Sequence, residues 1–210
     1  MIFKRNAYGD YILYFALLLI TGYAISNFSF QSDFFNRIGS LVWLIIFLIL
    51  TFYFKTTREL VIPLLNIKPF KEISTLLFII FSLILFYFLL QLSIHFEILI
   101  NHNLIFYYKN GLLGGEDVYG LIDVMIYAPI WEEIFFRGIL LFTLSKLLKP
   151  IWAIIIVSII FAFFHPFYLV ISLVAGIILS LMTLKTNSLI PSMVTHSIWN
   201  LYTGKLFLYF

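Results

Sequence analysis

Residues 73–94, ISTLLFIIFSLILFYFLLQLSI, form an uninterrupted apolar segment without a charged side chain. A helix needs about 20 mostly apolar residues to cross the ~30 Å hydrocarbon layer of a bilayer. Residues 11–28 and residues 38–54 are free of charge in the same way. We therefore predict three transmembrane helices in the first half of the chain.

The composition of the whole chain excludes a soluble domain. Of its 210 residues, 63% are hydrophobic and 11% are charged, whereas a soluble domain is about half apolar and roughly a quarter charged. A net charge of +3 is too small for the clustered basic face that binds nucleic acid. The chain has no cysteine, which excludes disulfides, thiolate metal sites and a cysteine nucleophile. The expected surroundings are therefore a lipid bilayer.

Four further spans are predicted in the second half of the chain, at residues 121–148, 151–164, 167–184 and 189–209. Pro150 can begin the second of them, because the first helical turn tolerates proline. Pro166 disfavours helical geometry at the preceding residue, so it separates the second from the third. The predicted fold is all-α: a polytopic transmembrane bundle of about seven helices, or eight if Pro129 divides the first of these spans.

The basic residues predict the orientation, because Lys and Arg are concentrated in cytoplasmic loops. With the N-terminus inside, nine of the 13 Lys and Arg residues lie on the cytoplasmic side and three on the far side, while Arg137 lies within a span. The nine are Lys4, Arg5, Lys55, Arg58, Lys68, Lys71, Lys146, Lys149 and Lys185. We therefore expect a multi-pass membrane protein with a cytoplasmic N-terminus.

The mixed segment at residues 97–117 is predicted to be a loop. Gly111, Gly114 and Gly115 are typical of a loop between two helical segments.

Charged residues inside a membrane span are costly, at about 2.5–3.5 kcal/mol each. The span at 121–148 nevertheless contains Glu132, Glu133 and Arg137. Glu133 and Arg137 are four residues apart and can pair on one helix face, which by itself could serve only to fix helix packing. On a regular α-helix Arg137 lies about 140° around the axis from Glu132. That leaves Glu132 as an uncompensated carboxyl group, which is suited to general acid or base chemistry.

Two histidines lie among the apolar helices of the second half, His165 and His196. Either could simply bond a neighbouring helix, but two of them beside a carboxylate pair favour a functional site. His196 and Asn200 are four residues apart and share a helix face. The other two histidines, His95 and His102, lie at or beyond the end of a predicted span, so a solvated or interfacial position is expected for both.

Three short motifs occur in a fixed order: Glu132-Glu133-x-x-x-Arg137, Phe161-x-x-x-His165 and His196-x-x-x-Asn200. The pattern resembles the CAAX protease and bacteriocin-processing family (CPBP, also called Abi) of intramembrane glutamate endopeptidases, to which the Ras-converting CAAX endopeptidase is related. The resemblance covers residues 118–204. The first 117 residues resemble the family only as generic membrane spans. The resemblance therefore implies two parts: N-terminal transmembrane helices and their loops at residues 1–117, and a CPBP-type catalytic helical core at residues 118–210.

The resemblance implies a role for each motif. Glu132 and His165 would hold and deprotonate the attacking water. His196 and Asn200 would stabilise the oxyanion of the tetrahedral intermediate. The pair Glu133–Arg137 would mainly position its helix, although its glutamate could assist.

The resemblance also implies that no cofactor is needed. The alternative is a zinc ion held by Glu132, His165 and His196, which would match the ligand count of a catalytic zinc site. Other membrane proteases are disfavoured, because the sequence has no H-E-x-x-H pair and no G-x-S nucleophile motif, and Asp123 is the only aspartate inside a predicted span.

The predicted function is cleavage of a peptide bond in a membrane-associated peptide or protein, such as a leader peptide, a signalling peptide or a CAAX-like tail. The composition, rich in Ile, Phe, Asn and Lys, favours a prokaryotic cell membrane. One alternative is a non-proteolytic member of the same family that regulates a membrane partner or confers bacteriocin immunity. A proton-relay or transport protein is disfavoured, because polar groups are not repeated in the spans of the first half. No motif indicates the substrate sequence, the side from which substrate approaches, or the oligomeric state.

Overall fold

The computed structural model describes residues 5–31, 33–110 and 118–204, and these residues fold into helices without any strand. This confirms the all-α class. The α-helices are α1 (Arg5–Gln31), α2 (Asp33–Tyr53), α3 (Lys55–Val61), α4 (Ile73–Phe96), α5 (His102–Lys109), α6 (Val118–Ile122), α7 (Ala128–Glu132), α8 (Leu141–Ser145), α9 (Pro150–Phe163), α10 (Leu169–Thr186) and α11 (Ile190–Gly204). Short 3₁₀ turns lie at η1 (Ile62–Leu64), η2 (Lys68–Lys71) and η5 (Pro166–Tyr168). Two π-helical stretches, η3 (Asp123–Tyr127) and η4 (Glu133–Leu140), alternate with α6, α7 and α8.

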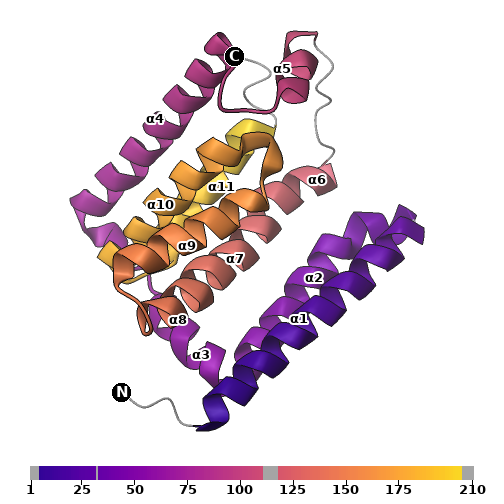
Figure 1. Ribbon diagram of the computed structural model, residues 1–210, viewed down its shortest axis with the longest axis vertical. Helices are drawn as coiled ribbons and strands as arrows, with labels where there is room; N and C mark the ends of the chain where they lie inside the picture. The colour runs from indigo at the N-terminus through magenta and orange to yellow at the C-terminus, as the bar shows by residue number, and fades with distance from the viewer. Residues whose placement is uncertain (1–4, 32, 111–117, 205–210) are drawn as a thin grey trace.

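The helices form two groups (Figure 1). Helices α1 and α2 pack against each other along one side of the molecule. Helices α9, α10 and α11 form the central group, in which α10 packs against both of the others, and α4 covers the opposite side. The run from α6 to α8 lies between these groups and contacts α2, α9 and α11. This run carries the first motif, so it is held from several directions.

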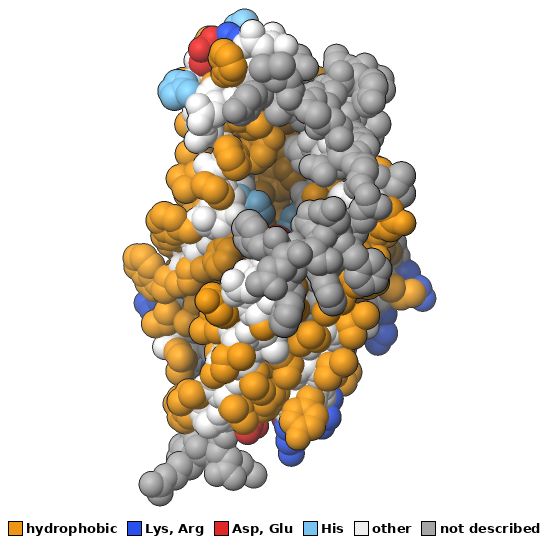
Figure 2. All heavy atoms as spheres, turned by 90° about the vertical axis from the view of Figure 1, so that its right-hand side faces the viewer, with side chains coloured by type: hydrophobic (Ala, Val, Ile, Leu, Met, Phe, Trp, Pro, Cys, Tyr) orange, Lys and Arg blue, Asp and Glu red, His pale blue; other side chains and the backbone are white. Residues whose placement is uncertain are grey.

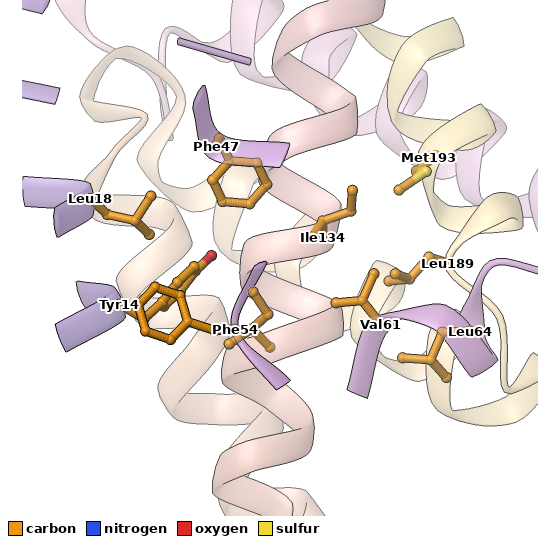
Figure 3. Packing of buried hydrophobic residues seen from close by; sticks show 10 residues of the cluster. Tyr14, Leu18, Phe47, Phe54, Val61, Leu64, Ile134, Leu189 and Met193 are labelled. Atoms are coloured by element: carbon orange, nitrogen blue, oxygen red, sulfur yellow. The ribbon is translucent and has the colours of Figure 1, made fainter. Parts of the chain in front are cut away.

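A buried apolar cluster joins the N-terminal helices to the motif-bearing run (Figure 3). Tyr14 of α1 and Phe47 of α2 lie on one side of this cluster, and Ile134 and Leu189 lie on the other. Tyr14 also shares a hydrogen bond of 2.9 Å with Thr51, and both side chains are fully buried. Ile134 is the neighbour of Glu133 in the chain, so this packing fixes the helix that carries the glutamates.

Three helices are long and apolar enough to cross a membrane: Tyr8–Asn27, Ile73–Phe96 and Pro166–Thr186. A fourth is counted if Ile38–Tyr53 and Lys55–Lys71, which meet at an angle of 100°, are one bent span. The predicted count of about seven is therefore not confirmed in the part of the chain that is described. Length is the reason for two of the predicted spans, because α9 has 14 residues and α11 has 15, and a crossing needs about 20. The span predicted at 121–148 is long enough, but it contains Asp123, Glu132, Glu133 and Arg137.

Some predictions fall outside the described residues. They are the glycine loop at 111–115, the division after residue 117, the end of the span predicted to reach residue 209, and the cytoplasmic position of Lys4.

Pro129 does not divide the span that contains it. The chain is continuously helical from residue 118 to residue 145, because α6, η3, α7, η4 and α8 follow one another without a break. The π-helical stretch at η3 directly precedes the turn that contains Pro129. The second π-helical stretch, at η4, means that the regular α-helical angle assumed between Glu132 and Arg137 does not hold.

Gly176 permits the close packing of α9 on α10. A Cβ atom at this position would lie 2.9 Å from the Cα and Cβ atoms of Ser158, so one of the two backbones would have to move. We expect Gly176→Ala to lower the free energy of unfolding by about 1–3 kcal/mol, which is the usual cost of adding a methyl group to a well-packed core. The matched control is Gly9→Ala, since a Cβ there meets nothing within 4 Å. Thermal unfolding of both purified variants tests this, and equal stability of the two would contradict it.

Candidate active site

Glu132 lies between two imidazole rings. Its Oε2 atom is 3.7 Å from Nε2 of His165 and 3.8 Å from Nε2 of His196. These distances are too long for direct hydrogen bonds, and this buried oxygen has no hydrogen-bond partner among the described residues. Three residues separated by up to 64 positions in the sequence are therefore brought together, as the motifs predicted.

The three side chains line a pocket of about 280 Å³, which Asn200 also lines. The surface of the molecule is hollowed on one face, and histidine side chains are visible inside the hollow (Figure 2). The side chains of Glu132 and His196 are 11% and 5% exposed, whereas the side chain of His165 is 30% exposed. His165 thus lies nearest to the opening, and the other two lie deeper.

The end of α9 sets the position of His165. The helix stops at Phe163, and His165 has φ −123° and ψ 61°, which is outside the helical region, as expected for a residue that precedes a proline. The Nδ1 atom of His165 lies 2.9 Å from the carbonyl oxygen of Phe161. A carbonyl can only accept, so Nδ1 carries the hydrogen. In the neutral ring, Nε2 then presents its lone pair towards Glu132.

The position of His196 is set from a different helix. Its Nδ1 atom lies 2.8 Å from Oε1 of Glu133, and a carboxylate accepts hydrogen bonds, so Nδ1 is the donor. This bond leaves Nε2 facing Glu132. Sequence reasoning did not find the contact, because the two residues are 63 positions apart and the glutamate was expected to pair mainly with Arg137.

The predicted ion pair between Glu133 and Arg137 is confirmed. Oε1 of Glu133 accepts a hydrogen bond of 2.8 Å from Nη1 of Arg137, and both side chains are completely buried. The guanidinium group of Arg137 also lies 4.2 Å from the centre of the Phe161 ring, which is a favourable cation–π distance. One carboxylate oxygen therefore accepts bonds from the arginine and from His196.

Asn200 reaches the pocket from α11, one helical turn after His196. Its Nδ2 atom donates a hydrogen bond of 2.8 Å to the carbonyl oxygen of Val124. A primary amide has two N–H donors, and this bond uses one of them. The predicted common face of His196 and Asn200 is confirmed, because both side chains line the same pocket.

Aromatic rings surround the polar groups. The ring of Phe161 lies 4.5 Å from that of His165 and 5.8 Å from that of His196, measured between centroids. Phe86 of α4 and Trp199 of α11 line the same pocket and pack edge to face at 5.6 Å. Phe161 was weak evidence in a chain with 25 phenylalanines, and no spacing pattern indicated Phe86 or Trp199.

The expectation about the two remaining histidines can be compared with the structure. His95 and His102 are exposed, in agreement with a solvated or interfacial position.

Comparison with known proteins found one family match. Residues 114–202 match the family model described as "Type II CAAX prenyl endopeptidase Rce1-like". This segment is similar to the Rce1-like family. The match contains all three motifs and ends shortly after Asn200. No curated protein and no solved structure matches the chain significantly. The matched segment thus supplies most of the residues that line the pocket, while Phe86, Thr203 and Gly204 lie outside it.

Arg137 should be essential for stability. Because its partner Glu133 is completely buried, Arg137→Met leaves that carboxylate partly uncompensated. We expect the free energy of unfolding to fall by about 3–5 kcal/mol, as it does when one member of a buried pair is removed. The control is Glu59→Gln, which breaks the exposed pair with Lys55 and should change stability little. Unfolding in detergent micelles measures the stability of both variants. If Arg137→Met lost no more stability than Glu59→Gln, the stabilising role of Arg137 would be contradicted.

Proposed function

We propose that this protein is an intramembrane endopeptidase that activates water with Glu132. The Rce1-like family is a family of CAAX endopeptidases, so proteolysis is the reaction class that the comparison supports. The observation that carries the proposal is the position of the Glu132 carboxyl oxygen, less than 4 Å from two imidazole nitrogens inside a pocket.

The spacing suits a bridging water molecule. Two polar atoms 3.7 Å apart can both lie within hydrogen-bond distance of one oxygen atom placed beside them. One hydrogen of that water would point to Glu132 and the other to Nε2 of His165. Its oxygen would attack the substrate carbonyl carbon while a proton passes to Glu132, which later delivers it to the leaving amine nitrogen. General base catalysis of this kind contributes typically 10²–10⁴-fold.

His196 and Asn200 supply the donors for the oxyanion. Because Nδ1 of His196 donates to Glu133, its Nε2 atom can donate only when the ring is protonated. The buried carboxylate of Glu133 stabilises that positive charge from the other side of the ring. The second N–H of Asn200 is the other donor. Each such donor is worth about 10²–10³-fold in rate.

The substrate is a membrane-associated peptide or protein. Apolar helices and the family match indicate an integral membrane protein, and a pocket between transmembrane helices favours a substrate that is itself held at the bilayer. We propose leader peptides, signalling peptides or CAAX-like tails as the substrate class, in a prokaryotic cell membrane with the N-terminus cytoplasmic. The distribution of Lys and Arg supports that orientation.

Substitution of the water-activating residues tests the function. Glu132→Ala and His165→Ala should each lower cleavage by at least about 10²-fold, while the protein still inserts and purifies normally. The matched control is His95→Ala, which removes an exposed histidine outside the pocket. A comparison of membrane peptidomes from wild-type and Glu132→Ala cells measures the effect and identifies the substrate through the products that disappear.

Two results would contradict the proposal. One is full cleavage by both alanine variants. The other is complementation of a deletion strain by both variants, which would replace proteolysis with regulation or immunity through binding.

We also propose that the reaction needs no metal. Exhaustive chelation of the purified protein should leave the cleavage rate unchanged. Loss of activity on chelation, restored by zinc and accompanied by about one bound zinc ion per chain, would instead establish a zinc site at Glu132, His165 and His196. Metal analysis of the same samples provides the second readout.

A further inference from the structure

We propose that Pro129 is a positioning residue for Asn200. Because proline has no backbone N–H, it leaves the carbonyl group of Val124 free to hold the Asn200 amide at the pocket. This inference rests on the proposed function, in which Asn200 donates to the oxyanion.

The hydrogen-bond pattern of the π-helical stretch leads to Pro129. The N–H of Ala128 donates to the carbonyl of Asp123, five residues earlier. In the same pattern the next carbonyl, that of Val124, would accept from residue 129. Residue 129 is proline, which has no hydrogen to donate. Val124 instead accepts from the side chain of Asn200, at 2.8 Å.

The proline ring also explains why the helix is wide at this point. In a regular α-helix the ring would collide with the carbonyl of the residue four positions earlier, which is Met125. The π-helical stretch Asp123–Tyr127 precedes Pro129 directly, and Pro129 is buried. A residue with an N–H group at position 129 would therefore have no ring to collide with the carbonyl of Met125. Its N–H could also donate to the carbonyl of Val124, which would then no longer be free.

Helix α11 approaches Val124 closely. A Cβ atom on Gly204 would lie 3.3 Å from Cγ2 of Val124, so a glycine at the end of α11 allows this approach. Asn200 lies one turn earlier on the same helix and lines the pocket beside His196. With one N–H held by Val124, the planar amide has a defined orientation, and its second N–H is free to donate to the substrate.

A double-mutant cycle tests the coupling. Pro129→Ala should lower kcat about tenfold with KM unchanged, which is the effect of losing one orienting hydrogen bond. Asn200→Ala should lower kcat about 10²-fold. In the Asn200→Ala background, Pro129→Ala should cause no further loss, because the group that it positions is absent. The assay uses a synthetic form of the peptide whose cleavage disappears in Glu132→Ala cells.

A backbone ester separates the missing N–H from the shape of the ring. Lactic acid, the hydroxy analogue of alanine, placed at position 129 by nonsense suppression also lacks the N–H, and it should restore kcat to within about threefold of wild type. The matched control is Pro150→Ala, because Pro150 lies in the first turn of α9, where a missing N–H has no consequence. An ester variant as slow as Pro129→Ala would overturn the proposal, as would additive losses in the cycle.

Thermal unfolding keeps the inference testable without any substrate. Asn200→Ala should lower Tm in the wild-type background and by less in the Pro129→Ala background, where residue 129 can donate to Val124. Equal losses of Tm in the two backgrounds would overturn the inference.

If Glu132→Ala stays active while the unfolding cycle shows coupling, the proposed function fails and the positioning of Asn200 stands. If Glu132→Ala is inactive but Asn200→Ala is fully active, the positioning role fails and the proteolytic function stands.

Discussion

The buried carboxylate of Glu133 is the group on which the site depends. A charge without solvent is strongly unfavourable unless it is paired and hydrogen bonded. One oxygen of Glu133 accepts from Arg137 on its own helix and from His196 on α11. The arginine in turn lies over the ring of Phe161 on α9. Compensation of one charge therefore holds three segments around the same pocket.

Backbone irregularities occur where the reactive groups lie. His165 occupies the non-helical junction before Pro166, and Asn200 bonds a carbonyl in a π-helical turn that precedes Pro129. Such turns are often found at functional sites, because they direct groups that a regular helix would keep in its own hydrogen-bond ladder. In this chain the two prolines give each irregularity a cause.

Short helices bring the site into the interior of the bundle. Helix α9 has 14 residues and is about 21 Å long, less than the ~30 Å hydrocarbon layer. A helix of this length that begins near one boundary ends inside the layer, and His165 follows its end. The same shortness explains why two of the predicted spans, α9 and α11, are not long enough to cross.

The sequence by itself determined the helical class, the membrane environment, the pairing of Glu133 with Arg137 and the common face of His196 and Asn200. Each of these depends on composition or on a spacing of four residues, which a helix converts directly into proximity. The Rce1-like motifs also indicated that Glu132, His165 and His196 belong together.

Only the tertiary structure decided how these groups are held. The bond that His196 donates to Glu133 joins residues 63 positions apart, and the bond that Asn200 donates to Val124 joins residues 76 positions apart. The π-helical stretch η3 was also invisible to a regular-helix argument, since it directly precedes Pro129 and packs against α11. Spacing along one helix is a local property, whereas the approach of two helices depends on every side chain packed between them.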